Sequence, residues 1–309
     1  MDATSPLLVI VGPTGSGKSD LAIRLALDLN GEIVNCDSLQ IYRHFNIGTA
    51  KVPPAERHGI PHHMMDIAEP DEVFTAGDYA RLARPILREI AGRGKLPIVV
   101  GGTGFYLKAL LEGLFSGPQR DEALRMRLVE RETRRSGSLH RLLSRFDAEG
   151  AARIHPRDVQ KLTRAVEICL LARRTLTELF GEGRDPLTGF SIVKVGLDPD
   201  RGELYARLNE RCRRMFEAGL VDEVRGILAM GYSPESKPFE SIGYHQTIKY
   251  LRGEKTIEEA IADTQQETRR YAKRQWTWFR RDPAIRWFKN SKNSGQAGII
   301  EFLSATLPT

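Results

Sequence analysis

GPTGSGKS, residues 12–19, follows a short apolar run at residues 7–11 and precedes a segment in which Leu21, Leu25 and Leu29 recur at helical spacing. The stretch matches G-x-x-x-x-G-K-[ST], the pattern of a phosphate-binding loop between a strand and a helix. Its glycines permit a turn whose backbone N–H groups point inward, and the start of the helix adds partial positive charge. The sequence therefore predicts a site for a phosphate chain.

Seven residues of this loop are predicted to bind the phosphate chain. They are Gly12, Thr14, Gly15, Ser16, Gly17, Lys18 and Ser19. The Lys18 side chain can reach the distal phosphates, and the Ser19 hydroxyl can bind Mg²⁺. Mg²⁺ is the one cofactor that the sequence predicts, with Ser19 as its protein ligand.

Four further apolar runs have the length of strands. Residues 32–36 and 96–100 are rich in β-branched side chains, and residues 192–197 and 285–288 follow late in the chain. Continuous apolar runs separated by helical segments indicate a parallel sheet that is buried on both faces. The predicted fold class is α/β, a parallel sheet like that of P-loop NTPases, flanked by helices.

The sequence pattern changes after Gly117-Pro118. Helical periodicity without strands continues from there to a loop at residues 181–189, which contains Gly and Pro. Residues 118–190 are therefore predicted to form a helical insertion domain, including a long helix at 158–180. Residues 1–117 and 191–309 are predicted to form the α/β body. Its C-terminal helices are expected at residues 203–216, 220–230 and 257–279.

Composition places the chain among ordinary globular proteins. Of 309 residues, 41% are hydrophobic and 28% charged, which excludes collagen-like, wholly disordered and disulfide-stapled classes. The apolar runs are far shorter than the roughly 20 residues of a membrane span, and no secretory signal is visible. The three cysteines are widely separated. We expect a cytoplasmic protein without membrane contact.

The positive charge is concentrated in two segments. The formal net charge is +6; 15 basic and 10 acidic residues at 120–184 give +5, and eight basic residues and one acidic residue at 269–289 give +7. The rest of the chain is therefore acidic. This asymmetry suggests a polyanionic partner, although two solvated basic helix faces would give the same pattern.

P-loop ATPases and GTPases hold Mg²⁺ with a second acid on a neighbouring strand. Here residues 96–100 lead into Gly101-Gly102-Thr103, with no carboxylate. Asp37, after residues 32–36, is the acid at a neighbouring strand end. Because ligands bind beyond the carboxyl ends of parallel strands, Lys18, Asp37 and Thr103 should face one crevice. The alternative role for Asp37-Ser38 is a turn or helix cap.

Eight segments together resemble the tRNA dimethylallyltransferase family, whose members prenylate an adenosine next to the anticodon. They are GPTGSGKS (12–19), DSLQIY (37–42), IGTAK (47–51), PHH (61–63), GGTGFY (101–106), RIHP (153–156), IGY (242–244) and KRQ (273–275). The resemblance extends from about residue 7 to residue 287 and lacks the C-terminal zinc finger of eukaryotic members. The resemblance is therefore to the bacterial form of the family.

The resemblance implies that the loop holds the diphosphate of dimethylallyl diphosphate rather than ATP. The dimethylallyl group then passes to the exocyclic amine of the adenosine and diphosphate is released. By resemblance, Asp37 is the hydrogen-bond partner or general base of that amine, Thr103 lies near the diphosphate or the base, and Arg211 contacts the diphosphate. From periodicity alone, Arg211 is equally a residue on the polar face of a helix.

The resemblance also implies two partners, the tRNA anticodon loop and dimethylallyl diphosphate, and no obligate protein partner is evident. The implied tRNA-binding residues are Asp37, Ser38, Leu39, Gln40, Thr103, Arg125, Gln160, Lys161, Arg164, Gly243, Tyr244, His245, Lys273, Arg274, Gln275 and Arg280. Two depart from the family pattern, because arginine is usual at Lys161 and a basic residue at His245. Trp276 and Phe279, three residues apart, also fit core packing.

Three other functions are consistent with parts of the sequence. A small-molecule or nucleotide kinase would use the same loop and Mg²⁺, but leaves the basic segment at 269–289 unexplained. A prenyltransferase that acts on free adenine nucleotides would not need either basic segment. An RNA-binding module with an inactive loop would show no turnover.

Overall fold

The computed structural model describes residues 4–115, 117–289 and 295–306, and divides the chain into two compact units. The first, here called the α/β body, comprises Met1–Leu111 and Leu187–Thr309. The second, the helical unit, is Glu112–Pro186. The predicted boundaries at residues 118 and 190 fall a few residues later in the chain than these.

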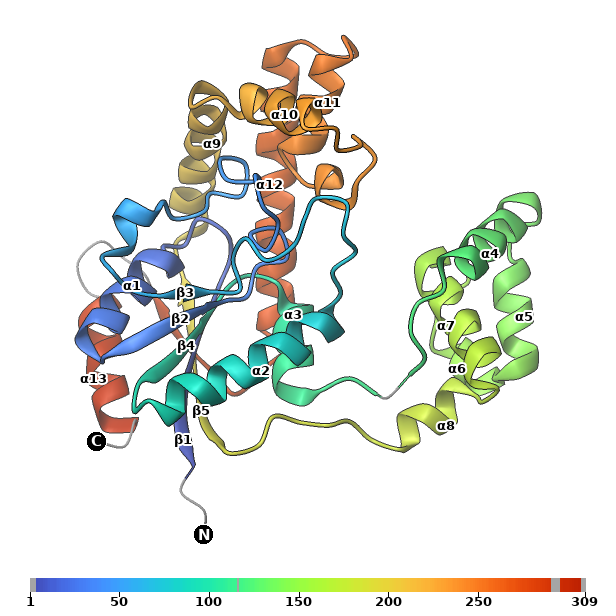
Figure 1. Ribbon diagram of the computed structural model, residues 1–309, viewed down its shortest axis with the longest axis horizontal. Coiled ribbons are helices and arrows are strands. Elements are labelled where there is room, and N and C mark those ends of the chain that lie inside the picture. The colour runs from blue at the N-terminus through green and yellow to red at the C-terminus, as the bar shows by residue number, and fades with distance from the viewer. Residues whose placement is uncertain (1–3, 116, 290–294, 307–309) are drawn as a thin grey trace. The chain divides into compact units, whose positions relative to one another are not determined.

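A single six-stranded sheet forms the centre of the α/β body, and all its strand pairs are parallel (Figure 1). The strand order is β3-β2-β4-β1-β5-β6. The strands are β1 (Ser5–Val11), β2 (Gly31–Asn35), β3 (His62–His63), β4 (Leu96–Val100), β5 (Phe190–Asp198) and β6 (Ile285–Lys289). The predicted α/β fold class is confirmed. The sequence does not predict β3, because two residues are too few to form a pattern.

Both faces of the sheet are buried, as its continuous apolar strands require. Leu8 and Ile10 of β1 face a core that includes side chains from α1 (Lys18–Asp28) and α13 (Gly295–Thr306). The alternating residues of β1 are buried as well. Helix α2 (Ala76–Gly92) begins at a capping box on Thr75 and contacts β2 and β4.

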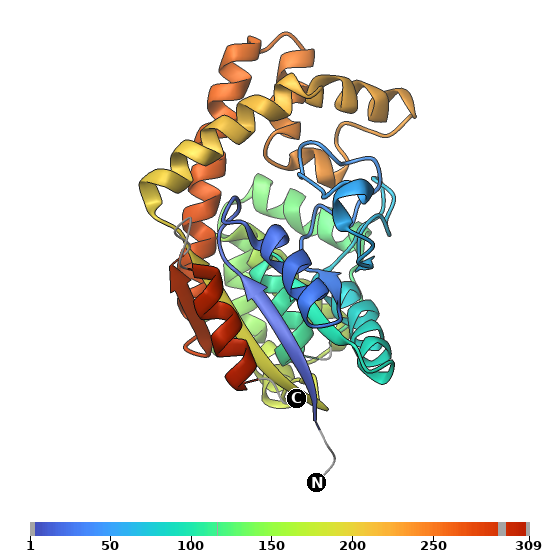
Figure 2. The same cartoon turned by 90° about the vertical axis from the view of Figure 1, so that its left-hand side faces the viewer.

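The C-terminal part of the body is helical. Its helices are α9 (Arg201–Glu217), α10 (Leu220–Ala229), α11 (Tyr244–Leu251) and α12 (Ile257–Phe279). Figure 2 shows α9 beside α12, where Leu204 and Leu208 pack on Ala272. The predicted ends of α9 and α10 agree within two residues, since Gly219 separates them in the left-handed conformation. The remaining elements of the body are α3 (Gly104–Glu112) and the 3₁₀ turns η1 (Pro54–Arg57) and η2 (Lys237–Glu240).

The helical unit has a core of its own, in which Leu139, Leu143 and Leu162 are fully buried. Its helices are α4 (Glu122–Arg134), α5 (Ser138–Phe146), α6 (Ala148–Ala152), α7 (Val159–Ala172) and α8 (Leu176–Gly181). The prediction of one helix at 158–180 is wrong. Arg173 adopts the left-handed conformation, and a capping box on Thr175 starts α8. None of the helices in the described part of the chain is both long enough and apolar enough to span a membrane.

Glu32 of β2 is a buried carboxylate with three side-chain hydrogen-bond partners. Its Oε2 accepts hydrogen bonds from Arg93 (2.8 Å) and His63 (2.7 Å), and its Oε1 accepts one from Lys95 (2.9 Å). Burial by itself would raise the pKa of Glu32. The hydrogen bonds from Lys95 and His63 and the charge of Arg93 outweigh burial and lower this pKa to about 2.

We expect Glu32→Gln to lower the free energy of unfolding of the body at pH 7 by about 3 kcal/mol. Because the folded pKa lies below the unfolded value, the contribution of Glu32 is complete above the unfolded value of 4.5 and is lost as the pH falls toward 2. Denaturation at pH 7, 4.5 and 3 measures it. Glu89→Gln, which removes an exposed partner of Arg93, is the matched control and should cost below about 0.5 kcal/mol. An equal acid sensitivity of wild type and Glu32→Gln would contradict this role.

Candidate active site

The phosphate-binding loop leaves the end of β1 and enters α1 at Lys18. Gly15 and Gly17 have φ values of 74° and 84°, which side chains rarely adopt. A Cβ on Gly15 would lie 2.7 Å from Leu208 Cδ2, so α9 packs directly against the loop. The loop is therefore held by β1 on one side and by α9 on the other, and the N-terminus of α1 points toward it.

Lys18 lies in a cluster of three charges. Its Nζ donates a hydrogen bond to the Pro13 carbonyl at 2.7 Å. Burial lowers the pKa of Lys18 to about 7, a shift that nearby Asp37 opposes and nearby Arg211 increases. The Lys18 amine is thus only partly protonated at neutral pH, and a bound anion would favour the protonated form.

Asp37 and Thr103 follow adjacent strands, β2 and β4, and their backbones are joined. The Thr103 Oγ1 accepts a hydrogen bond from Ser38 N (3.0 Å), and Thr103 N donates to Cys36 O (3.2 Å). Asp37 Oδ1 accepts from Leu39 N (2.9 Å), and more weakly from Gln40 N. The turn predicted as the alternative for Asp37 is therefore present. From the described residues, Oδ1 of Asp37 accepts hydrogen bonds and Oδ2 accepts none. The turn therefore orients the carboxylate and leaves Oδ2 for another partner.

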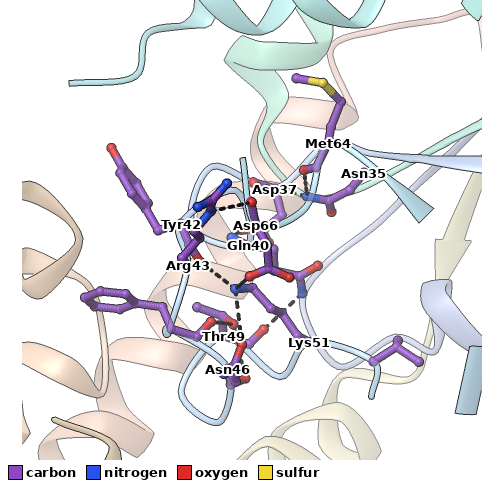
Figure 3. A network of polar contacts seen from close by, with 12 residues as sticks. Asn35, Asp37, Gln40, Tyr42, Arg43, Asn46, Thr49, Lys51, Met64 and Asp66 are labelled. Carbon is purple, nitrogen blue, oxygen red and sulfur yellow. Dashed lines mark hydrogen bonds and ion pairs between the residues drawn. The ribbon is translucent and has the colours of Figure 1, made fainter. Parts of the chain in front are cut away.

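The segment that follows Asp37 is fixed by a buried lysine (Figure 3). Lys51 Nζ donates to the Tyr42 carbonyl (2.5 Å) and to Asp66 Oδ1 (2.6 Å). Gln40 Nε2 donates to Thr49 O at 3.1 Å. The segments 37–42 and 47–51, singled out in the sequence as separate motifs, thus form one polar network. It holds Gln40 in place, and with it the turn of Asp37.

The other side of this segment rests on α10 and α11. Glu223 accepts hydrogen bonds from the N–H groups of Asn46 (3.0 Å) and Ile47 (2.7 Å), and from the Tyr244 hydroxyl (2.6 Å). A Cβ on Gly48 would lie 2.4 Å from the Tyr244 ring. Glu223 was not predicted as a site residue, because its backbone partners at residues 46–48 lie 175 to 177 positions away in the sequence.

Tyr244 is fully buried and Gly243 is buried, so both have structural roles, and their tRNA contacts stay predictions. Burial also raises the pKa of the Tyr244 hydroxyl, and the Glu223 carboxylate adds to the shift. His245, the third residue of this predicted group, is exposed. It keeps its predicted tRNA role.

Arg211 and Tyr271 complete the crevice from α9 and α12. Arg211 follows Leu208, the residue in contact with Gly15, by three positions and thus lies on the same helix face. Burial raises the pKa of Tyr271, with a further contribution from the Asp37 charge. Tyr271 was not predicted from the sequence. Its spacing of four residues from Gln275 on one helix face is the signal that could have revealed it.

Gln275 is the one residue of KRQ (273–275) that faces the crevice. Its Oε1 accepts the Thr14 N–H at 2.7 Å, and its Nε2 donates to Gly102 O at 2.9 Å. Gln275 is 5% exposed and its side chain links two loops, and its tRNA contact stays a prediction. The same contact occupies the Thr14 N–H, which was predicted to bind phosphate.

Ser19, the second residue of α1, is the oxygen donor that the loop presents for Mg²⁺. Mg²⁺ in phosphate sites uses one or two protein ligands and fills its shell with phosphate oxygens and water. Among residues 4–115, 117–289 and 295–306, no cluster of three or more His, Cys, Asp and Glu side chains could hold a metal. One hydroxyl beside a phosphate loop fits a magnesium ion that binds together with a diphosphate.

Residues 40–282 match the model of the family described as IPP transferase. The chain belongs to this family. The match begins after the phosphate-binding loop and covers most of the α/β body and all of the helical unit.

Two curated relatives of the IPP transferase family span nearly the whole chain. The tRNA dimethylallyltransferase of Solibacter usitatus is 60% identical over 94% of both chains. That of Koribacter versatilis is 56% identical over 93% of this chain and 94% of its own.

Solved structures of the family have the same fold. The tRNA isopentenylpyrophosphate transferase of Bacillus halodurans is 38% identical with a TM-score of 0.73, covering 98% of this chain and 97% of its own. A eukaryotic dimethylallyltransferase solved acting on tRNA is 29% identical with a TM-score of 0.85, covering 98% and 80%. The predicted resemblance to the family is confirmed.

Four predicted tRNA-binding residues lie in the helical unit. Arg125 and Arg164 both pair with Glu167 Oε2, at 3.7 and 2.7 Å, and Glu167 is completely buried. The Arg125 side chain is only 17% exposed and helps to neutralise this carboxylate; its tRNA contact stays a prediction. Gln160 and Lys161 are exposed, and Lys161 Nζ pairs with Asp158 at 2.6 Å. These two keep their predicted tRNA role.

The predicted tRNA-binding cations of α12 are exposed. Lys273 and Arg274 project from the helix, and Arg280 donates a hydrogen bond to Asp198 Oδ1 at 3.0 Å. Trp276 Nε1 donates to the same oxygen at 3.0 Å, and Phe279 is buried in the core. The mixed basic and aromatic segment of this IPP transferase therefore contains exposed cations, an exposed Trp278, and the partly or fully buried rings of Trp276 and Phe279.

Proposed function

We propose that this chain transfers a dimethylallyl group from dimethylallyl diphosphate to the exocyclic amine of an adenosine adjacent to the anticodon in tRNA. The observation that carries the proposal is the crevice at the ends of β1, β2 and β4. There a phosphate-binding loop with Lys18 faces Asp37 and Thr103. The names of the relatives, tRNA dimethylallyltransferases, support the same reaction.

The diphosphate half of the crevice suits ionisation of an allylic carbon–oxygen bond. As that bond breaks, its electron pair leaves with the diphosphate oxygen. Loop N–H groups, Lys18 and Arg211 would then stabilise the growing negative charge. Mg²⁺ bound by Ser19 would supply further neutralisation of the leaving diphosphate. No γ-phosphate is transferred, so the second acid of P-loop ATPases is not needed.

The other half of the crevice suits a weak nitrogen nucleophile. The adenine amine shares its lone pair with the ring, so it needs a proton acceptor as the new carbon–nitrogen bond forms. Asp37, oriented by its turn, is positioned to accept one amine proton, and Thr103 holds the backbone beside it. The balanced reaction gives prenylated adenosine, diphosphate and a proton released through Asp37.

A base within an anticodon loop must leave its stack to enter such a crevice. We propose that the exposed cations of the α/β body, with Gln160 and Lys161 of the helical unit, bind the surrounding RNA backbone. Because the proposed substrate is tRNA, we also propose that the reaction takes place in the cytoplasm. The kinase alternative is not favoured by the family relationship.

The test is incubation of the protein with unmodified tRNA, Mg²⁺ and dimethylallyl diphosphate labelled in the prenyl group. Label should appear in the adenosine next to the anticodon, in step with released diphosphate. Parallel reactions contain free AMP or γ-labelled ATP in place of the expected substrates. Label in AMP alone would favour the nucleotide prenyltransferase, transfer of γ-phosphate would favour a kinase, and no product at all would favour an RNA-binding protein.

The exposed cations Arg274 and Arg280 should contribute to tRNA binding but not to diphosphate binding. Replacing Arg274 and Arg280 together by glutamine should weaken tRNA binding and reduce the slope of log Kd against log salt by about 1 to 2, since each lost phosphate contact removes roughly 0.7 to 0.9. Filter binding at several salt concentrations measures the slope. Arg88 and Arg225, exposed on α2 and α10, give a control pair with the same change of charge. A fall in diphosphate affinity as large as that in tRNA affinity would refute separate sites.

A further inference from the structure

Three segments that are far apart in the sequence meet at one amide group. Thr14 lies in the loop after β1, Gly102 lies after β4, and Gln275 lies in α12. The side chain of Gln275 accepts from Thr14 N at 2.7 Å and donates to Gly102 O at 2.9 Å. The two hydrogen bonds connect positions separated by 261 and 173 residues. The amide is therefore a bridge between the two strand-end loops that form the crevice.

The space around this bridge is closed. A Cβ on Gly102 would lie 2.1 Å from Gln275 Nε2, so the amide fills the place that any other residue at 102 would need. The Gln275 side chain is nearly inaccessible to solvent. The amide serves both loops because it carries an acceptor for the Thr14 N–H and a donor for the Gly102 carbonyl.

The two bridged loops carry the two halves of the proposed reaction. The loop of Thr14 continues into Lys18 and Ser19, the predicted diphosphate residues. Gly102 precedes Thr103, whose hydroxyl accepts the Ser38 N–H beside Asp37. The Gln275 bridge thus joins the loop of the predicted diphosphate residues to the loop beside Asp37.

We propose that Gln275 is a positioning residue that fixes the distance between the diphosphate loop and the Thr103–Asp37 side of the crevice. Its neighbours Lys273 and Arg274 are exposed on the same helix, so the bridge also links the proposed RNA-binding surface to the diphosphate loop. The inference rests on the proposed function, since it assigns a geometric role in that reaction. Misplacement of reacting groups by about 1 Å can cost about 100-fold in rate.

The test uses Gln275→Met, which keeps the length of the side chain and removes both hydrogen bonds. At saturating tRNA we expect kcat to fall about 10- to 100-fold, with tRNA affinity within about two-fold of wild type. Binding of Mg²⁺–pyrophosphate, measured by calorimetry without tRNA, should weaken about 10-fold because the loop loses its anchor at Thr14. Gln266→Met, the same change at an exposed position on α12, is the matched control and should leave all three quantities unchanged.

Gly102→Ala provides an independent route to the same defect, because the added methyl group displaces the amide without changing Gln275. Both variants should have thermal midpoints within about 3 °C of wild type. The inference is overturned if Gln275→Met keeps kcat and pyrophosphate affinity within about two-fold of wild type. It is equally overturned if only tRNA affinity falls, because Gln275 would then be an RNA contact. Failure of the wild-type protein to prenylate tRNA would instead overturn the proposed function, while the pyrophosphate titration would still report on the bridge.

Discussion

Asp37→Asn should lower kcat for prenyl transfer about 10²- to 10⁴-fold, while tRNA affinity stays within about two-fold. Asparagine has the shape of aspartate, and its Oδ1 can still accept the N–H groups of Leu39 and Gln40 that form the turn. The neutral amide cannot accept a proton from the adenine amine. The substitution therefore separates the structural role of residue 37 from its proposed chemical role.

Single-turnover transfer of labelled prenyl groups to tRNA measures this effect, with filter binding for tRNA affinity. Asp71→Asn is the matched control, because Asp71 is exposed and lies outside the crevice. Turnover by Asp37→Asn equal to that of Asp71→Asn would show that Asp37 serves the turn alone. A large loss of tRNA affinity would show that the carboxylate acts mainly in RNA binding.

Lys18→Met should weaken binding of Mg²⁺–pyrophosphate about 100-fold, because the loop loses its principal cation in a desolvated place. The wild type should also take up protons on binding. Its Lys18 has a pKa of about 7, so near pH 7.5 most molecules must protonate this group when the anion binds. Wild-type affinity should therefore fall as the pH rises above 7, after correction for titration of pyrophosphate itself.

Calorimetry in two buffers of different ionisation enthalpy measures the proton uptake. Lys18→Met should lose this uptake, whereas Lys237→Met, a change at an exposed lysine, should retain it. Equal proton uptake by Lys18→Met and wild type would assign the proton to another group. Unchanged pyrophosphate affinity in Lys18→Met would remove the loop from the diphosphate site.

The strands and the crevice could be predicted because they depend on local patterns and one topological rule. Residues 96–100 form a strand with the predicted ends, since a continuous apolar run meets glycine there. Lys18, Asp37 and Thr103 each follow a strand of one parallel sheet, and this alone brings them together. The break in the helix predicted at 158–180 could also have been found, because Thr175 and Glu178 have capping-box spacing.

Which polar side chains reach solvent could not be predicted in the same way. Gln275 and Tyr244 belong to polar motifs, yet both are buried by partners from distant segments. Arg125 follows the rule that a buried carboxylate must be paired, but its partner Glu167 looks in the sequence like any other helical acid. Exposure depends on packing between segments, which sequence periodicity does not describe.

The bridge at Gln275 has a consequence for biosynthesis. Thr14 is translated 261 residues before Gln275, its hydrogen-bond partner. β1 likewise pairs with β5, whose residues follow the entire helical unit. Contacts of such long sequence separation form late, after their loop-closure entropy has been offset by other structure. The nascent chain therefore cannot complete the proposed diphosphate site until α12 has been translated. A chain that ends before α12 would bind neither substrate productively.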